Sequence, residues 1–174
     1  MKDSKKMTVK LLHWGMDHKA DLIRICNGVD RLYLSDRMPY PYTEKDADWW
    51  LEMVREHDGV DGLFRAVAVD GSIVGSISLE QKSDVYRVDA AIGYMLLSEY
   101  WSKGIMTEAV RMICDEGFEK LDITRISGIA YAPNIASQRV LLKNGFIREC
   151  LQKDAAIKAG RLYDICLFGK TKVQ

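Results

Sequence analysis

The stretch that decides the fold runs from Ile92 to Ala109 and reads IGYMLLSEYWSKGIMTEA. Up to Leu97 it alternates like a strand, and beyond Gly104 apolar residues recur at helical spacing. A strand is therefore expected to run through a glycine loop into a helix. The first turn of such a helix presents unpaired N–H groups and the positive end of the helix dipole, which suit a phosphate group. A lone glycine before a helix also serves in ordinary turns, so this stretch by itself leaves both interpretations open.

Length and charge narrow the class of protein. The 174 residues carry 25 Lys plus Arg and 25 Asp plus Glu, a formal net charge of zero. No overall field draws such a chain to nucleic acid or to an anionic membrane, so neither is expected as a partner. With 48% hydrophobic residues the chain can bury a core, and its length predicts a single domain over residues 1–174.

No targeting, membrane or metal-binding pattern stands out. The longest stretch free of Asp, Glu, Lys and Arg runs from Ile126 to Gln138, too short to cross a bilayer. Lys10 and His13 interrupt the apolar segment that a secretion signal requires, so a cytoplasmic location is expected. The four cysteines form no CxxC pair and the three histidines no HExxH motif. We therefore expect no metal.

Strand and helix patterns alternate along the whole chain. The expected strands are 8–12, 63–69, 73–79, 87–97, 126–131, 146–151 and 162–168. The expected helices are one capped by Asp17 with Ala20, Ile23 and Val29 facing inward, one from Thr43 to His57, one between Gly104 and Lys120, and one from Asn134 to Gly145. Asp70-Gly71 tolerates the positive φ angles of a tight turn and predicts a hairpin. The pattern indicates a mixed sheet of about seven strands.

A second motif follows the first at a distance and reads APNIASQRVLLKNGF over residues 132–146. The motifs YWSKG at 100–104, TEA at 107–109, Asn134-x-x-Ser137 and KNGF at 143–146 together resemble the RimJ/RimL-like branch of the GNAT superfamily of N-acetyltransferases. The resemblance extends back to the loop at 39–43 and covers nearly the whole chain. It implies an α/β (α+β) fold, a single GNAT-like domain with a mixed, mostly antiparallel twisted sheet and helices on both faces.

The resemblance implies acetyl-CoA as the acetyl-donor cosubstrate. In that interpretation the strand at 95–97 pairs with the pantetheine arm, and the loop at 102–107 holds the pyrophosphate. The implied cofactor-binding residues are Met95, Leu96, Leu97, Ser102, Lys103, Gly104, Ile105, Met106, Thr107 and Asn134. The implied reaction is transfer of the acetyl group to a primary amine, a protein N-terminus or a small amine, by direct attack in a ternary complex.

Two proton transfers need side chains, and two positions used elsewhere in the superfamily are apolar here. Leu141 stands where other members place a tyrosine acid, and Ala130 where some place a glutamate base. The resemblance to the RimJ/RimL-like branch implies Ser137 as acid, and Glu80, at the end of its strand, is the carboxylate expected as base. Tyr94 is interpreted as a strand residue that packs on the core. A non-catalytic acyl-CoA-binding or regulatory module remains the alternative.

An aromatic loop over residues 31–42 is the candidate acceptor site. Tyr33, Tyr40 and Tyr42 could hold an amine by stacking and cation–π contact, or form a small hydrophobic cluster beneath the loop. The family resemblance favours substrate binding. The expected partners are thus acetyl-CoA and an amine acceptor, and the chain is expected to be a monomer or a homodimer.

Overall fold

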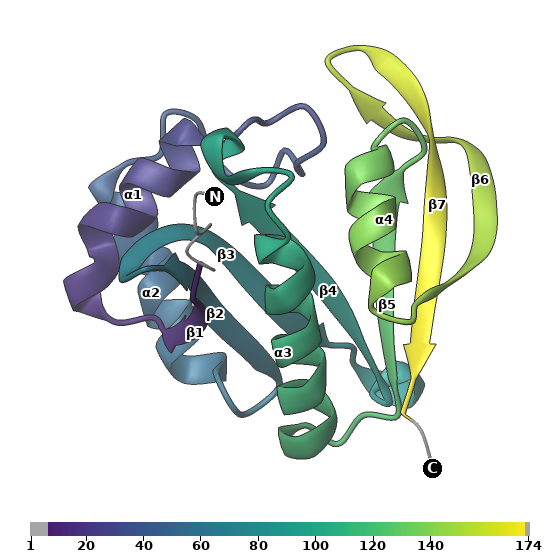
Figure 1. Ribbon diagram of the computed structural model, residues 1–174, viewed down its shortest axis with the longest axis horizontal. Coiled ribbons are helices and arrows are strands. Elements are labelled where there is room, and N and C mark those ends of the chain that lie inside the picture. Colours follow the sequence, from purple (N-terminus) through teal and green to yellow (C-terminus); the bar gives the residue numbers. More distant parts are fainter. Residues whose placement is uncertain (1–6, 173–174) are drawn as a thin grey trace, which may run out of the picture.

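The computed structural model describes residues 7–172, and within them seven strands form one sheet in the order β1-β2-β3-β4-β5-β7-β6 (Figure 1). The strands are β1 (Val9–His13), β2 (Gly62–Val69), β3 (Ser72–Gln81), β4 (Asp89–Leu96), β5 (Arg125–Tyr131), β6 (Ile147–Lys158) and β7 (Arg161–Thr171). Neighbours pair antiparallel except β4 and β5, which are parallel. The expected mixed, mostly antiparallel sheet is confirmed.

Helices cover both faces of the sheet, as expected. They are α1 (Lys19–Gly28), α2 (Glu44–His57), α3 (Ile105–Lys120) and α4 (Ile135–Lys143), with short 3-10 turns η1 (Met16–His18), η2 (Asp84–Tyr86) and η3 (Ser98–Tyr100). Successive side chains of β2 point to opposite faces. Leu63 and Val67 pack in the cluster that includes α3, whereas Phe64 and Ala66 pack in the cluster that includes α1 and α2. Figure 1 shows α3 and α4 on the same side of the sheet.

Two local signals of the sequence are confirmed. The Thr43 hydroxyl accepts from the Asp46 N–H at 3.4 Å, and the Asp46 carboxylate accepts from the Thr43 N–H at 2.8 Å, which completes a capping box. Asp70 and Gly71 have φ angles of 49° and 88° in the turn between β2 and β3. Both features depend on neighbouring residues, which is why the sequence reveals them.

The first helix differs from the expectation. Asp17 lies in η1, and the cap of α1 is His18, whose side chain makes no capping hydrogen bond. Ala20 is exposed, and the buried face consists of Leu22, Ile25 and Cys26. The predicted inward face was wrong at Ala20 because these three residues, together with Val29, form the apolar stripe at helical spacing.

The last two strands are longer than expected. β6 continues to Lys158 and β7 begins at Arg161, with Ala159 and Gly160 at φ angles of 48° and 76° in the turn. The register jumps between Gln152 and Ala156, and Asp154 has a φ of 49°. This bulge breaks the alternation of side chains, so the expected strand 146–151 ended too early.

Candidate functional site

The sheet splits between β4 and β5. In the described part of the chain their pairing comprises Asp89 with Arg125, Ala90 with Ile126 and Ala91 with Ser127. Beyond these pairs the two strands diverge, as Figure 1 shows, while β4 stays paired to β3 and β5 to β7. We call the region in which their backbones are no longer paired the wedge, with β4 as its first arm and β5 as its second. Its facing strand edges offer backbone groups that an extended chain of amides can pair with.

The N-terminus of α3 adjoins the end of the first arm. Gly104 is its cap, with a φ of 76° and no capping side chain, and Ser102 also has a positive φ of 58°. The Ile105 side chain is buried in the core. It therefore does not cover the backbone N–H groups in the first turn of α3. Lys103 is exposed, its Nζ 5.4 Å from the centre of the Tyr100 ring. This arrangement suits an anionic group.

A hydrogen bond holds the loop between β4 and α3 against the end of β4. The Trp101 indole N–H donates to the Leu96 carbonyl oxygen at 2.9 Å. Leu96 and Leu97 are buried, and Met95 packs against the cluster of α1 and α2. Met106 lies on the buried face of α3, and Thr107 accepts through its carbonyl oxygen from the Asn144 side chain at 3.0 Å. These residues therefore present mainly backbone to the wedge.

The N-terminus of α4 stands on the second arm. The Asn134 side chain accepts from the Ser137 N–H at 3.2 Å and so caps the helix. The Ser137 hydroxyl lies 2.7 Å from the Tyr94 hydroxyl on the first arm. Burial raises the pKa of Tyr94 to about 12. A side-chain hydrogen bond thus links the first arm to α4, the helix that follows the second arm.

The aromatic loop reaches the second arm from the opposite face of the sheet. Tyr131 follows Ala130, which packs on the side of α3 and α4, so the tyrosine points to the other side. The Tyr33 ring centre lies 5.4 Å from that of Tyr131 and 6.5 Å from that of Tyr163. Lys158 Nζ donates to the Leu34 carbonyl oxygen at 2.9 Å. The loop thereby joins the α1–α2 side of the molecule to β5 and β7.

The three tyrosines expected to bind substrate occupy different environments. Tyr33 is half-buried in the aromatic contact described above. Tyr40 is 68% exposed, with the Arg31 guanidinium 5.3 Å from its ring centre. Tyr42 is buried in the α1–α2 cluster, and its backbone N–H donates to the Asn27 side chain at 2.8 Å. The Tyr42 ring is therefore packed in the core, which favours the hydrophobic-cluster interpretation for this residue.

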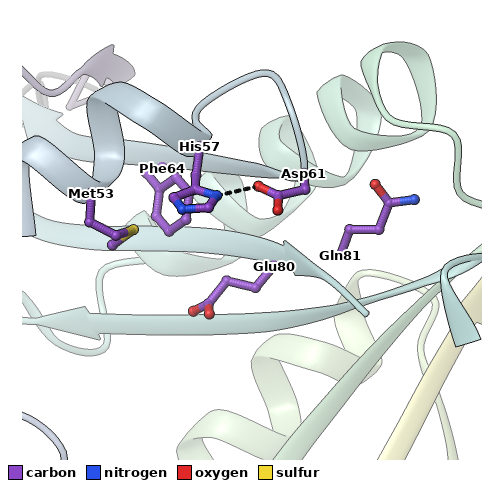
Figure 2. Close-up of a pocket in the computed structure, with 6 residues that line it drawn as sticks. All are labelled: Met53, His57, Asp61, Phe64, Glu80 and Gln81. Atoms are coloured by element: carbon purple, nitrogen blue, oxygen red, sulfur yellow. Dashed lines mark hydrogen bonds and ion pairs between the residues drawn. The ribbon is translucent and has the colours of Figure 1, made fainter. Parts of the chain in front are cut away.

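Glu80 lies apart from Ser137. It is exposed on β3, paired with Ala91 at the closed end of the wedge, and it alternates with the buried Leu79 of the α3 side. Its side chain therefore lies on the α2 face. There it lines a cavity of about 210 Å³ together with Met53, His57, Asp61, Phe64 and Gln81. Figure 2 shows it across that cavity from the hydrogen-bonded pair of His57 and Asp61, 2.7 Å apart.

Residues 7–172 hold neither a metal-binding cluster nor a membrane-spanning helix. These residues include no group of three or more His, Cys, Asp or Glu side chains arranged to hold a metal ion. Their helices include none that is long and apolar enough to cross a membrane.

Comparison with known proteins defines the class to which this fold and wedge belong. Residues 9–147 match the acetyltransferase (GNAT) domain family, so the chain belongs to the GNAT acetyltransferases. A probable N-acetyltransferase of Bacillus subtilis, YjcK, is 41% identical over 88 residues, which are 51% of this chain and 48% of that protein. The first curated relatives are matched over 64%, 56% and 48% of their own lengths, so the chain spans about half to two thirds of them.

Solved structures share the fold. RimL, a ribosomal L7/L12 alpha-N-protein acetyltransferase in complex with coenzyme A, superposes with a TM-score of 0.83 at 19% identity over 94% of each chain. RimJ of Mycobacterium smegmatis, in complex with CoA-disulfide, gives 0.79 at 24% identity over 94% of this chain and 81% of that chain. The resemblance to the GNAT superfamily is confirmed by the family match, and these two structures show that the chain shares the fold of RimL and RimJ.

Proposed function

We propose that this chain transfers an acetyl group from acetyl-CoA to a primary amine by direct attack within a ternary complex. The observation that carries the proposal is the wedge. It combines an anion-binding helix N-terminus, two open strand edges and a hydroxyl group in one opening of a GNAT fold. These are the features that a phosphate-bearing, amide-bearing thioester requires.

The residues of the wedge fit coenzyme A. The N–H groups over residues 102–107 and the Lys103 ammonium suit the pyrophosphate, and a Cβ at Gly104 would meet no atom within 4 Å, so the space beside it is open. The backbone of Met95, Leu96 and Leu97 supplies an edge for the pantetheine amides. Asn134 stands on the opposite arm as the cap of α4. Acetyl-CoA supplies the thioester when it is bound.

In the proposed reaction the chain stabilises two negative charges as they develop, one on the carbonyl oxygen and one on the departing sulfur. A neutral amine attacks the thioester carbonyl, and a fixed backbone N–H of the first arm, within residues 94–97, stabilises the oxyanion. The Ser137 hydroxyl donates to the sulfur as the C–S electron pair moves onto it. A thiolate has an ordinary pKa near 8.5, so one donor suffices for departure near neutral pH.

Glu80 is the proposed base, acting from the α2 face at the closed end of the wedge. Tyr33 and Tyr40 are the proposed acceptor-binding residues, on the loop that reaches β5 and β7. The neighbour of Glu80, Ala91, is three strand residues from Tyr94, or about 10 Å. Proton transfer therefore runs through ordered water rather than by direct contact. The likeness to RimL supports a protein N-terminus as acceptor, and a small amine is the other candidate within the same reaction.

A non-catalytic acyl-CoA-binding module is the second candidate function. It is favoured by Leu141 and Ala130, which are both buried in the core at positions where other members carry proton-transfer groups. Both functions require binding of acetyl-CoA, and amine-dependent release of coenzyme A separates them.

Acetyl-CoA is expected to stabilise the folded chain. At 100 times its dissociation constant, a ligand that binds only the folded state adds about 2.7 kcal/mol to the free energy of unfolding. Chemical unfolding with and without acetyl-CoA measures this difference. Equal stability in both conditions, together with a calorimetric titration that shows no heat, would refute the proposal.

Replacing Gly104 by Val is expected to weaken acetyl-CoA binding at least tenfold. The valine strains a position with a φ of 76° and places a branched side chain where the ligand approaches the backbone. Gly160→Val is the matched control, since Gly160 has the same φ and open surroundings but lies in the β6–β7 turn. Calorimetric titration should show near wild-type affinity for the control, and equal affinities of the two variants would place the anion site elsewhere.

A further inference from the structure

A hydrogen bond crosses the wedge at Tyr94. The Tyr94 hydroxyl lies 2.7 Å from Ser137 Oγ and 3.3 Å from the Ser137 carbonyl oxygen, to which it can only donate. Tyr94 belongs to the first arm, and Ser137 to the first turns of α4, which follows the second arm. The backbone ladder between the arms ends at Ala91 and Ser127. The hydroxyl pair thus joins the first arm to the helix that follows the second arm, beyond the point where the backbone pairing of the arms stops.

Packing does not explain this hydroxyl. Tyr94 shares its face of β4 with Ile92, which packs against the α3 cluster without a polar group. A phenylalanine ring would fill the same space. The tyrosine oxygen instead has a defined partner on a different element, 43 residues further along the chain.

We propose that Tyr94 is a positioning residue for acetyl transfer, because its hydroxyl sets the direction in which the Ser137 hydroxyl donates. This inference rests on the proposed role of Ser137. The phenol has one hydrogen, so when Tyr94 donates it to Ser137 Oγ at 2.7 Å, the 3.3 Å contact with the Ser137 carbonyl oxygen is not a second bond, and the serine hydrogen is left to point into the wedge. Without that bond, a serine in a helix readily donates back to a backbone carbonyl one turn earlier.

The protonation of Tyr94 is consistent with a role as hydrogen-bond donor. Burial raises its pKa to about 12, so the phenol keeps its proton at the pH values used in assays. The Asn134 side chain holds the Ser137 N–H at 3.2 Å, which fixes the serine backbone while Tyr94 fixes the hydroxyl. A chain of two hydroxyls also polarises, so the second donates more strongly than it would alone.

The step balances without a net change at either hydroxyl. The amine nitrogen forms the C–N bond and passes its proton to the base, and the C–S electron pair moves to the sulfur. Ser137 donates a hydrogen bond to that sulfur while it accepts one from Tyr94. The thiolate leaves and takes its proton from water.

Four proteins test the inference: wild type, Tyr94→Phe, Ser137→Ala and the double variant. Tyr94→Phe is expected to lower kcat about fivefold to tenfold, the rate equivalent of one net hydrogen bond, with the KM for acetyl-CoA unchanged. Adding it to Ser137→Ala should cost nothing further, because the group it positions is already gone. Tyr86→Phe, an exposed tyrosine in η2, is the control and should keep full activity.

The outcomes separate this inference from the proposed function. Full kcat in Tyr94→Phe, a change confined to KM, or additive losses in the double variant would each overturn the role of Tyr94. An inactive wild type would overturn the proposed function instead. Thermal unfolding of the same four proteins measures the contribution of the Tyr94–Ser137 hydrogen bond to stability in the absence of substrate. The changes in melting temperature of the two single variants are expected not to add up to that of the double variant.

Discussion

Ser137→Ala is expected to lower the turnover number at least 100-fold while the affinity for acetyl-CoA changes by less than about twofold. Removal of one preorganised hydrogen-bond donor to a developing negative charge costs roughly 10² to 10³ in rate. The Ser137 hydroxyl stands at the head of α4, bonded to Tyr94 across the wedge, and Leu141 offers no replacement. Steady-state kinetics gives the turnover number, and calorimetry gives the affinity.

The contrasting result would be an unchanged turnover number with a higher KM for acetyl-CoA. Ser137 would then be a contact to the cosubstrate, and the thiolate would leave without a donor. Ser72→Ala, at the exposed start of β3, is the control for serine replacement and should match wild type in both constants.

Arg65→Ala is expected to cost about 3 kcal/mol of unfolding free energy, since loss of one partner of a buried ion pair leaves the others uncompensated. Arg65 is 3% exposed on β2. Its Nη1 donates to Asp58 at 2.6 Å, and its Nη2 donates to Glu116 of α3 at 2.6 Å. Denaturant unfolding measures the loss. Arg111→Ala, which breaks exposed pairs on the same helix, should cost less than about 1 kcal/mol.

The ion pairs of Arg65 also predict how the difference in unfolding free energy between wild type and Arg65→Ala depends on pH. Burial acts to raise the pKa of Glu116, but pairing with Arg65 and Lys120 outweighs it and holds the pKa below its ordinary value near 4.5. A carboxylate with a lowered folded pKa stabilises the fold above its unfolded pKa and loses this contribution as the pH falls through the folded value. The gap between wild type and Arg65→Ala should therefore narrow in acid. A loss below about 1 kcal/mol at neutral pH would contradict the assignment.

The sequence predicted those parts of the fold that short-range signals define. The Thr43–Asp46 capping box and the Asp70-Gly71 turn each involve neighbouring residues, and the structure confirms both. The course of β6 past residue 152 was missed, because a bulge near Asp154 removes the alternation on which strand prediction relies.

The candidate site likewise combines features that local motifs predict with features that only tertiary packing creates. The loop at Gly104 and the cap at Asn134 follow from local motifs, and the structure sets both beside the wedge. The bond between Tyr94 and Ser137 carries no such signal, since no spacing rule relates residues that meet through tertiary packing. The burial of the Tyr42 ring also lacks a local signal. An aromatic residue in a loop looks alike in sequence whether its ring faces solvent or the core.

The most direct test of the central claim is release of the coenzyme A thiol from acetyl-CoA in the presence of an amine panel. The panel should contain peptides with free N-termini, polyamines, aminoglycosides and amino acids. Mass spectrometry gives the mass of each product. Release that depends on at least one amine, with one acetyl group gained by that amine per thiol, is the expected result. Binding of acetyl-CoA with release equally slow in the presence and absence of every amine would contradict catalysis and leave an acyl-CoA-binding module.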